Sequence, residues 1–202
     1  MPRLVVLALG LSIVLSQAAE AATRKWTGAG GDSAWDTPSN WENGILPVDG
    51  DSLHFPAGLA APLLNDTSLS FIDHLWIDDG YQLNGNPIEI RDGITIAPTV
   101  SAYVGLEVRV AQSQHWTGAK LGGSDPGGTS SLNVVFTDAS AVLSVSAAGT
   151  WYLFVQGAGE VSLINGVLWR HTNGSTYLYV MNGFQYVPVP MESLDPTWQA
   201  IP

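Results

Sequence analysis

Three tryptophans near the start of the chain, Trp26, Trp35 and Trp41, are the first residues with binding chemistry. Their flat apolar rings and N–H donors could stack on sugar rings, which predicts a carbohydrate site. Alternatively, they cover the open end of a repetitive β structure, whose first layer otherwise exposes apolar side chains and unpaired backbone. Because large aromatic side chains bury readily, we expect the covering role and keep glycan binding as the alternative.

Two pairs of aspartates could supply oxygen ligands to Ca²⁺: Asp49 with Asp51, and Asp78 with Asp79. Neither pair has the spacing of an EF-hand loop or of the glycine-rich nonapeptide that binds calcium. Aspartate in turns ordinarily accepts hydrogen bonds from backbone N–H groups. We therefore expect no cofactor, with calcium at these four carboxylates as the alternative.

The residues that could carry catalysis are scattered along the chain. A glycosidase needs two carboxylates facing each other across a cleft. Glu89 and Glu107 alternate with apolar neighbours, so we expect them to face solvent instead. The histidines lack the close spacing of zinc ligands, and neither a nucleophile elbow nor a phosphate loop occurs. We predict no catalytic site, and an enzyme is the less favoured interpretation.

Many short runs of alternating apolar and polar residues must position these side chains. This alternation is typical of strands buried on one face. Asn-Gly and Asp-Gly pairs between the runs, such as Asp79-Gly80 and Asp92-Gly93, predict tight reversals. The clearest runs are Leu53-His-Phe55, Leu75-Trp-Ile77, Ile88-Glu-Ile90, Ile94-Thr-Ile96, Leu106–Val110, Leu132-Asn-Val134, Leu143-Ser-Val145, Val161-Ser-Leu163 and Tyr177–Val180.

The spacing of the runs favours a solenoid over a β-sandwich. Sandwich strands usually recur every 8–12 residues. Here the runs at Leu75 and Ile94 match at an offset of nineteen residues, those at Leu143 and Val161 at eighteen, and that at Leu178 follows seventeen later. Coils of this size are typical of one β-helix rung. We predict an all-β, right-handed parallel β-helix, with the β-sandwich as the alternative.

The chain divides into four predicted regions. Residues 1–21 are a signal peptide, 22–55 a Trp/Gly-rich N-terminal cap with the first strand, 56–187 the β-solenoid and 188–202 a Pro-rich tail. Residues 117–131 form an insertion rich in Gly and Ser. Proline cannot donate to a strand ladder, so the tail is expected to be extended or to cover the C-terminal end.

The cap sequence KWTGAGGDSAWDTPSNWENGILPVDGDSLHF carries a family resemblance. It resembles the opening of bacterial autotransporter-associated β-strand repeat proteins, which are exported surface proteins built on right-handed β-helices. It is also similar, more weakly, to the eight-glycine domain of animal cell-surface hyaluronidases. We expect no C-terminal membrane barrel of the autotransporter kind. The matching residues are Trp26-Thr-Gly28, Gly30-Gly-Asp32, Trp35, Asn40-Trp41, Gly44, Pro47, Gly50-Asp51 and Phe55.

The first residues have the three parts of a secretory signal. Arg3 supplies the positive charge, Leu4–Leu15 form an apolar run, and Ala19-Glu-Ala21 forms a cleavage site. The apolar run is shorter than the roughly 20 residues that a membrane-spanning helix requires. We therefore expect an exported protein that is extracellular, on the cell surface or periplasmic, with no membrane span after signal removal.

The composition limits the partners. The chain has no Cys, so an exported form must be stabilised by packing and backbone pairing alone. Its net charge of −11 repels nucleic acids and other polyanions. The strongly apolar last strands, with Phe184, Tyr186 and Val187, predict a self-association surface at the C-terminal end.

Together these features predict an exported structural or adhesive β-helix module of the cell surface or extracellular matrix. Glycans or other surface proteins are the expected partners. The alternatives are a carbohydrate-binding module, a carbohydrate-active enzyme, or a subunit of a surface assembly.

The first testable prediction concerns export. Because Ala19-Glu-Ala21 has the small residues that signal peptidase requires, the exported protein should begin near Ala22. Mass spectrometry of the secreted or periplasmic product would measure the mature mass and its N-terminal peptide. An exported product that retains Met1 would contradict the prediction.

Overall fold

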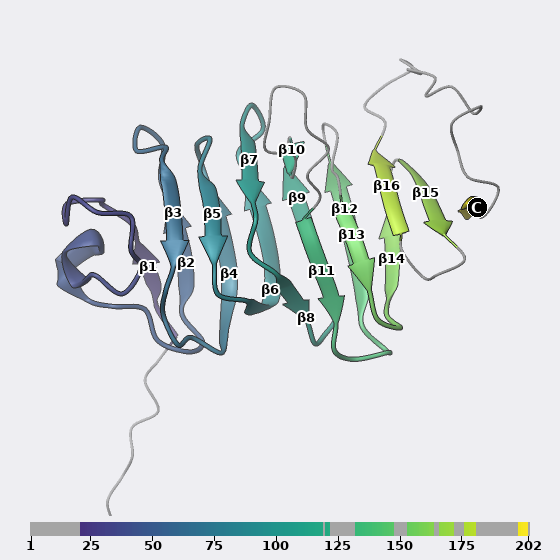
Figure 1. Ribbon diagram of the computed structural model, residues 1–202, viewed down its shortest axis with the longest axis horizontal. Coiled ribbons are helices and arrows are strands. Elements are labelled where there is room, and N and C mark those ends of the chain that lie inside the picture. The colour runs from purple at the N-terminus through teal and green to yellow at the C-terminus, as the bar shows by residue number, and fades with distance from the viewer. Residues whose placement is uncertain are drawn as a thin grey trace, which may run out of the picture.

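The computed structural model describes residues 21–118, 120–121, 132–147, 153–163, 166–171, 176–180 and 198–201. Residues 1–20 of the predicted signal peptide and the Phe184, Tyr186 and Val187 surface lie outside these residues. In the described part, the chain is all-β and parallel strands stack into a β-solenoid (Figure 1). No described helix is long and apolar enough to cross a bilayer.

Each rung of the solenoid contributes strands to three faces around a common core. Face 1 contains β1 (Thr23–Lys25), β2 (Ser52–Phe55), the second halves of β4 (Phe71–Ile77) and β6 (Ile88–Ile96), β9 (Gln114–Gly118), β12 (Val142–Ala147) and β14 (Glu160–Leu163). Face 2 contains the first halves of β4 and β6, then β8 (Val108–Val110), β11 (Leu132–Phe136) and β13 (Leu153–Gln156). Face 3 contains β3 (Pro62–Asn65), β5 (Gln82–Gly85), β7 (Ser101–Val104) and β10 (Lys120–Leu121).

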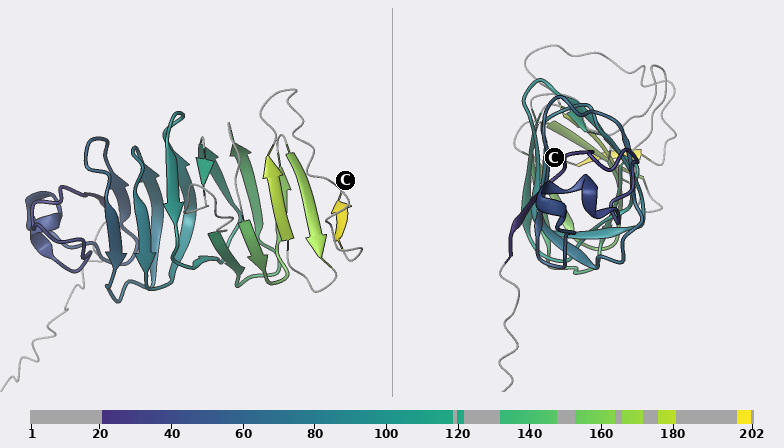
Figure 2. Two further views of the ribbon diagram at one scale, coloured as in Figure 1. Left: turned by 45° about the horizontal axis from the view of Figure 1, so that its top comes forward. Right: turned by 90° about the vertical axis from the view of Figure 1, so that its left-hand side faces the viewer.

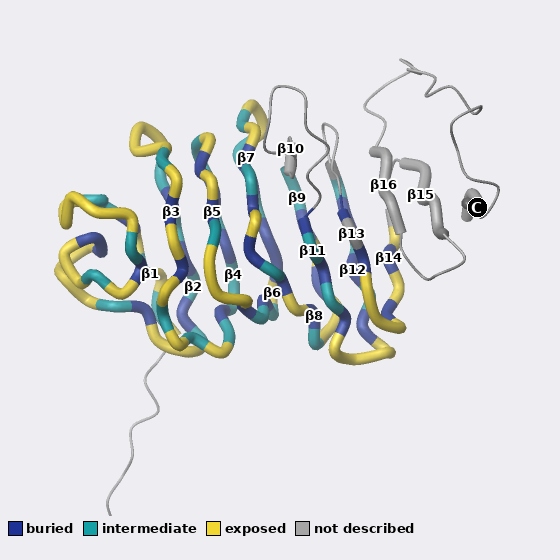
Figure 3. The backbone as a smooth tube through the Cα atoms, viewed as in Figure 1, coloured by how far each residue is buried: buried dark blue, intermediate teal, exposed yellow. Residues whose placement is uncertain are grey.

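Parallel pairing confirms the solenoid and rules out the sandwich. Leu75 and Ile77 lie opposite Ile94 and Ile96, at the predicted offset of nineteen residues. Leu143 likewise lies opposite Val161, at the predicted offset of eighteen. In each rung the alternation directs one set of side chains into the core, where Leu53, Leu75, Ile94 and Val145 are almost completely buried. Figure 3 shows this as buried residues alternating with less buried ones along the strands.

Two expectations about turns and ends need correction. Asp92-Gly93 does not form a reversal between strands but lies inside β6, where the strand bends from face 2 to face 1. The run at Leu178 does not continue the parallel stack. It belongs to β16 (Thr176–Val180), which pairs antiparallel with β13 and β15 (Gly166–His171). Alternation is the same in parallel and antiparallel strands, so it cannot reveal this change of direction.

The end of the chain returns to the sheet. Residues Trp198–Ile201 form β17, which pairs antiparallel with β15. The part of the predicted tail that the structure describes is therefore a paired strand at the last layer. This agrees with a covering role for that segment and places an antiparallel layer at the C-terminal end of the stack.

The bend at Gly93 generates a prediction about stability. Gly93 has φ +146°, and a Cβ there would overlap the carbonyl oxygen of His115 on the next rung. Gly93→Ala should therefore destabilise by about 1–3 kcal/mol through overpacking, in addition to its backbone strain. Gly58→Ala is the control, because Gly58 has φ +86° but no atom near its Cβ position. Urea unfolding would compare them, and equal losses would contradict the close approach of the rungs.

Candidate functional site

The N-terminal cap holds the three tryptophans in one aromatic cluster. Trp26, Trp35 and Trp41 have exposed fractions of 2%, 0% and 2%. Trp26 and Trp41 meet edge to face with centroids 5.2 Å apart, and Trp35 lies 5.3 Å from Phe55 of the first rung. Their rings are covered by protein, which agrees with the expected covering role and leaves no ring face open for the alternative, stacking on sugars. The cap segment that carries them lies across the N-terminal end of the solenoid, as the right-hand view of Figure 2 shows.

The loop that carries the cluster is held by a buried amide. Asn40 ends the short 3-10 helix η1 (Pro38–Asn40), which precedes a second one, η2 (Glu42–Gly44). The Asn40 side chain accepts a hydrogen bond from the N–H of Gly30 and donates to the carbonyl of Ala34. The indole N–H of Trp41 donates to the carbonyl of Trp35 over 2.8 Å. The spacing of tryptophan and asparagine in the cap therefore serves its folding.

The four aspartates predicted as calcium ligands lie in separate environments. Asp51 is fully buried, 2.6 Å from the Nε of Arg24, and accepts hydrogen bonds from two backbone amides. Asp49 accepts from the amides of Ser70 and Phe71. Backbone hydrogen bonds from Gly80 and Gly58 lower the pKa of Asp79. Such turn-capping bonds are the ordinary role of aspartate.

No three or more His, Asp or Glu side chains within the described ranges gather closely enough to hold a metal ion. Asp78 binds a histidine instead, with its Oδ2 2.7 Å from the Nε2 of His54. Calcium at these carboxylates stays a prediction of the sequence.

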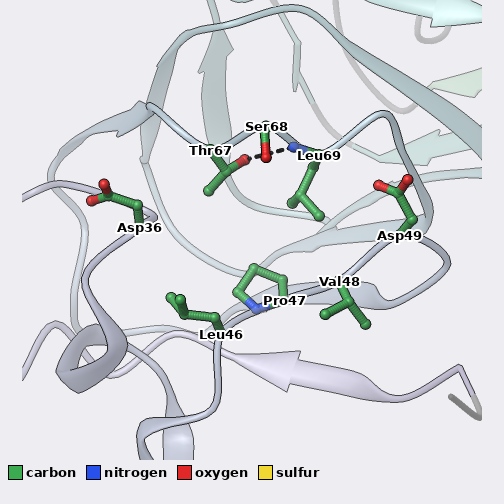
Figure 4. A pocket seen from close by; sticks show the side chains of 8 residues that line it. All are labelled: Asp36, Leu46, Pro47, Val48, Asp49, Thr67, Ser68 and Leu69. Carbon is green, nitrogen blue, oxygen red and sulfur yellow. Dashed lines mark hydrogen bonds between the residues drawn. The ribbon is translucent and has the colours of Figure 1, made fainter.

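A shallow groove of about 440 Å³ lies between the cap and the first rung (Figure 4). Its apolar part consists of Leu46, Pro47, Val48 and Leu69, and Thr67 and Ser68 add hydroxyl groups. Asp36 and Asp49 lie at its two ends. An apolar floor with a few polar groups at the rim is typical of small-ligand sites.

One end of the groove carries a pair of carboxyl groups. The backbone N–H of Asp36 donates to Oδ1 of Asp66 over 3.0 Å. A hydrogen bond between their side chains is the largest cause that raises the pKa of Asp36, and desolvation and repulsion from Asp66 add to it. Such a pair can hold a proton between its carboxyls. Both residues are exposed at the surface, so we assign the pair no catalytic role.

The outer side of face 1 contains a second cluster that the sequence interpretation missed. Trp76 lies between the buried Leu75 and Ile77 and is therefore directed outward, where it is half-buried. The signal was present in the run Leu75-Trp-Ile77, since strict alternation places its middle residue on the opposite side of the strand.

Two histidine–carboxylate pairs flank Trp76. His74 lies two residues before it on β4, with its ring centroid 4.3 Å from that of the indole and the planes inclined by 35°. The two ring nitrogens of His74 lie 3.0 Å from Oδ2 of Asp92 and 2.9 Å from Oγ1 of Thr95. The second pair is that of His54 and Asp78. These contacts fix the rings around Trp76 through strands of three successive rungs.

The Asp92–His74–Thr95 chain has the order of groups found in hydrolase triads. Acyl transfer also requires N–H donors aimed at the developing oxyanion. Thr95 lies inside β6, which pairs with β4 on one side and β9 on the other. The backbone N–H groups around Thr95 therefore form hydrogen bonds between strands and are not available to an oxyanion. The arrangement is therefore better suited to binding, since it presents oriented hydroxyl, imidazole and carboxylate groups beside an aromatic ring.

No protein-family model, no curated protein and no solved structure matches this chain. The similarity of the cap to autotransporter-associated repeats consequently remains a prediction based on the residues given above. The interpretation of the candidate sites therefore rests on the geometry of their residues alone.

The aromatic cap generates the third prediction. Trp41 is buried against two other tryptophans, so Trp41→Ala should cost about 3–5 kcal/mol of unfolding free energy. Trp41→Phe, which keeps an aromatic ring but loses the N–H donor to Trp35, should cost clearly less. Thermal and urea unfolding would measure both. An unchanged melting temperature for Trp41→Ala would show that the cap does not stabilise the solenoid.

Proposed function

We propose that this protein is a structural and adhesive solenoid module that acts outside the cytoplasm. The observation that carries the proposal is the elongated stack of parallel rungs closed at its N-terminal end by an aromatic cap (Figure 2). Such a stack extends in one dimension and presents long side surfaces, which suits a spacer or an adhesive stalk.

The way in which the fold is stabilised is compatible with an extracellular role. The chain has no cysteine, so its stability cannot depend on disulfides or on the redox state of the surroundings. Its core runs without interruption from the cap tryptophans to Val161. Each inner rung is hydrogen-bonded to the rungs above and below it, and these bonds do not require a cofactor.

The outer surface of face 2 supports the structural part of the proposal. Arg91 pairs with Glu89 at 2.7 Å and lies over the ring of Phe71, with its guanidinium carbon 3.3 Å from the centroid. Arg109 pairs in the same way with Glu107 at 2.9 Å. Each of these half-exposed pairs lies within one rung, whereas the contact of Arg91 with Phe71 joins β6 to β4 of the neighbouring rung. Both arginines are thus partnered, on a chain of net charge −11. Such a surface disfavours anionic partners and leaves neutral polymers and other proteins as the expected ones.

The proposal can be tested in the source organism by measuring surface location and adhesion. A strain lacking the gene should attach less well to its substratum than the parent. The full chain should restore both attachment and labelling of intact cells by an antibody. A chain in which Met replaces residues 1–21 should restore neither, because it cannot be exported. Unchanged attachment of the deletion strain, or a protein found only in the cytoplasm, would refute the proposal.

A further inference from the structure

We propose that the outer side of face 1, centred on Trp76, binds a linear uncharged polysaccharide that lies along the axis of the solenoid. The inference rests on the proposed adhesive function and names the ligand class of that function. It depends on a continuous row of outward residues, the orientation of the Trp76 ring, and the charge of the surface.

The row follows from the strand register. His54 lies opposite Trp76, Trp76 opposite Thr95, Thr95 opposite Thr117, and Thr117 opposite Ser146. All five are half-buried and on the outer side of β2, β4, β6, β9 and β12, which follow one another along the axis (Figure 1). Neighbouring strands lie about 4.8 Å apart, so the row presents one polar or aromatic group at each step. An extended polymer along the axis can contact successive groups.

The Trp76 ring is held in a defined orientation before any ligand binds. His74 packs against it, and the imidazole is itself fixed by Asp92 and Thr95. A ring that does not lose rotational freedom on binding contributes more to affinity. Aromatic rings of this kind offer a flat apolar face to the C–H side of a sugar.

The polar groups around the ring suit hydroxyl donors. The side chains of Asp78 and Asp92 are 41% and 76% exposed, so each carboxylate retains oxygens that can accept hydrogen bonds from sugar hydroxyls. The hydroxyls of Thr95 and Thr117, 3.5 Å apart, continue the row and can both donate and accept. Uronate or sulfate groups would meet these two carboxylates and a net charge of −11. The chemistry therefore selects an uncharged glycan.

The experiment measures binding of the mature chain to soluble β-glucan, mannan and xylan, with polygalacturonate as the anionic control, by calorimetry and Trp fluorescence. We expect at least one neutral polymer to bind, the uronate polymer not to bind, and affinity to rise with oligomer length until the row is covered. Trp76→Ala should weaken binding by about ten- to hundredfold, as expected for removing an aromatic stacking platform. Thr117→Ala should weaken it less.

Two control variants make the test specific. Ser144→Ala changes an outward residue of face 1 that lies outside the row, and it should leave affinity unchanged. Val48→Asp adds a charge to the groove beside the cap and should also leave it unchanged. Three results would each overturn the inference. They are unchanged affinity of Trp76→Ala for the neutral polymer, loss of affinity in Val48→Asp alone, and no binding of the parent protein to any neutral polymer. Melting curves of all variants should match that of the parent. If Trp76→Ala does not fold, the test rests on Thr117→Ala, and unchanged glycan affinity of that folded variant would overturn the inference.

The outcome is separable from that of the proposed function. Trp76→Ala protein should still be exported and should still label on intact cells, because the core beneath it is unchanged. Loss of glycan binding with retained surface location supports both statements. A surface protein without affinity for neutral glycans would refute this inference alone.

Discussion

Each inward side chain of the solenoid packs mainly against the residues directly above and below it in the stack. Leu53, Leu75 and Ile94 form one such column on face 1, and Ile72, Ile90 and Val110 form another on face 2. A rung buries its apolar side chains only if the next rung is present, so an end of the stack must be closed by something else. The aromatic cap meets this requirement at the N-terminal end. Trp26, Trp35 and Trp41 all contact Phe55, the residue that the first rung would otherwise expose.

Much of this arrangement could be predicted because it follows from local sequence patterns. Alternation gives the strands and their inner faces, and the offsets of eighteen and nineteen residues give the rung length. The direction of pairing after β14 could not be predicted, since antiparallel strands alternate in the same way. The bend at Asp92-Gly93 was also misassigned. The same Asp-Gly pair that reverses a hairpin can bend a strand between two faces, and only the neighbouring rung decides which occurs.

The sites were harder to predict than the fold, for a related reason. Tryptophan suggests a binding site by its chemistry, but its role depends on the side of the strand it occupies. The cap tryptophans were correctly expected to be buried. Trp76 was not recognised as a surface residue, although its neighbours Leu75 and Ile77 determine its outward direction. The partners of its cluster come from other rungs: Asp92 and Thr95 lie eighteen and twenty-one residues from His74. No sequence pattern marks such contacts until the register is known.

Register is therefore what connects the fold of this protein to its candidate binding surface. A stack that aligns apolar residues inside must align the intervening residues outside, at the same spacing and with the same order. The outward row from His54 to Ser146 is the external counterpart of the column that begins at Leu53. One aromatic residue in such a row gains oriented polar neighbours on the adjacent strands without any loop to position them. A regular surface of this kind matches a ligand that is itself regular and extended, whereas compact ligands are better matched by a concave site such as the groove beside the cap.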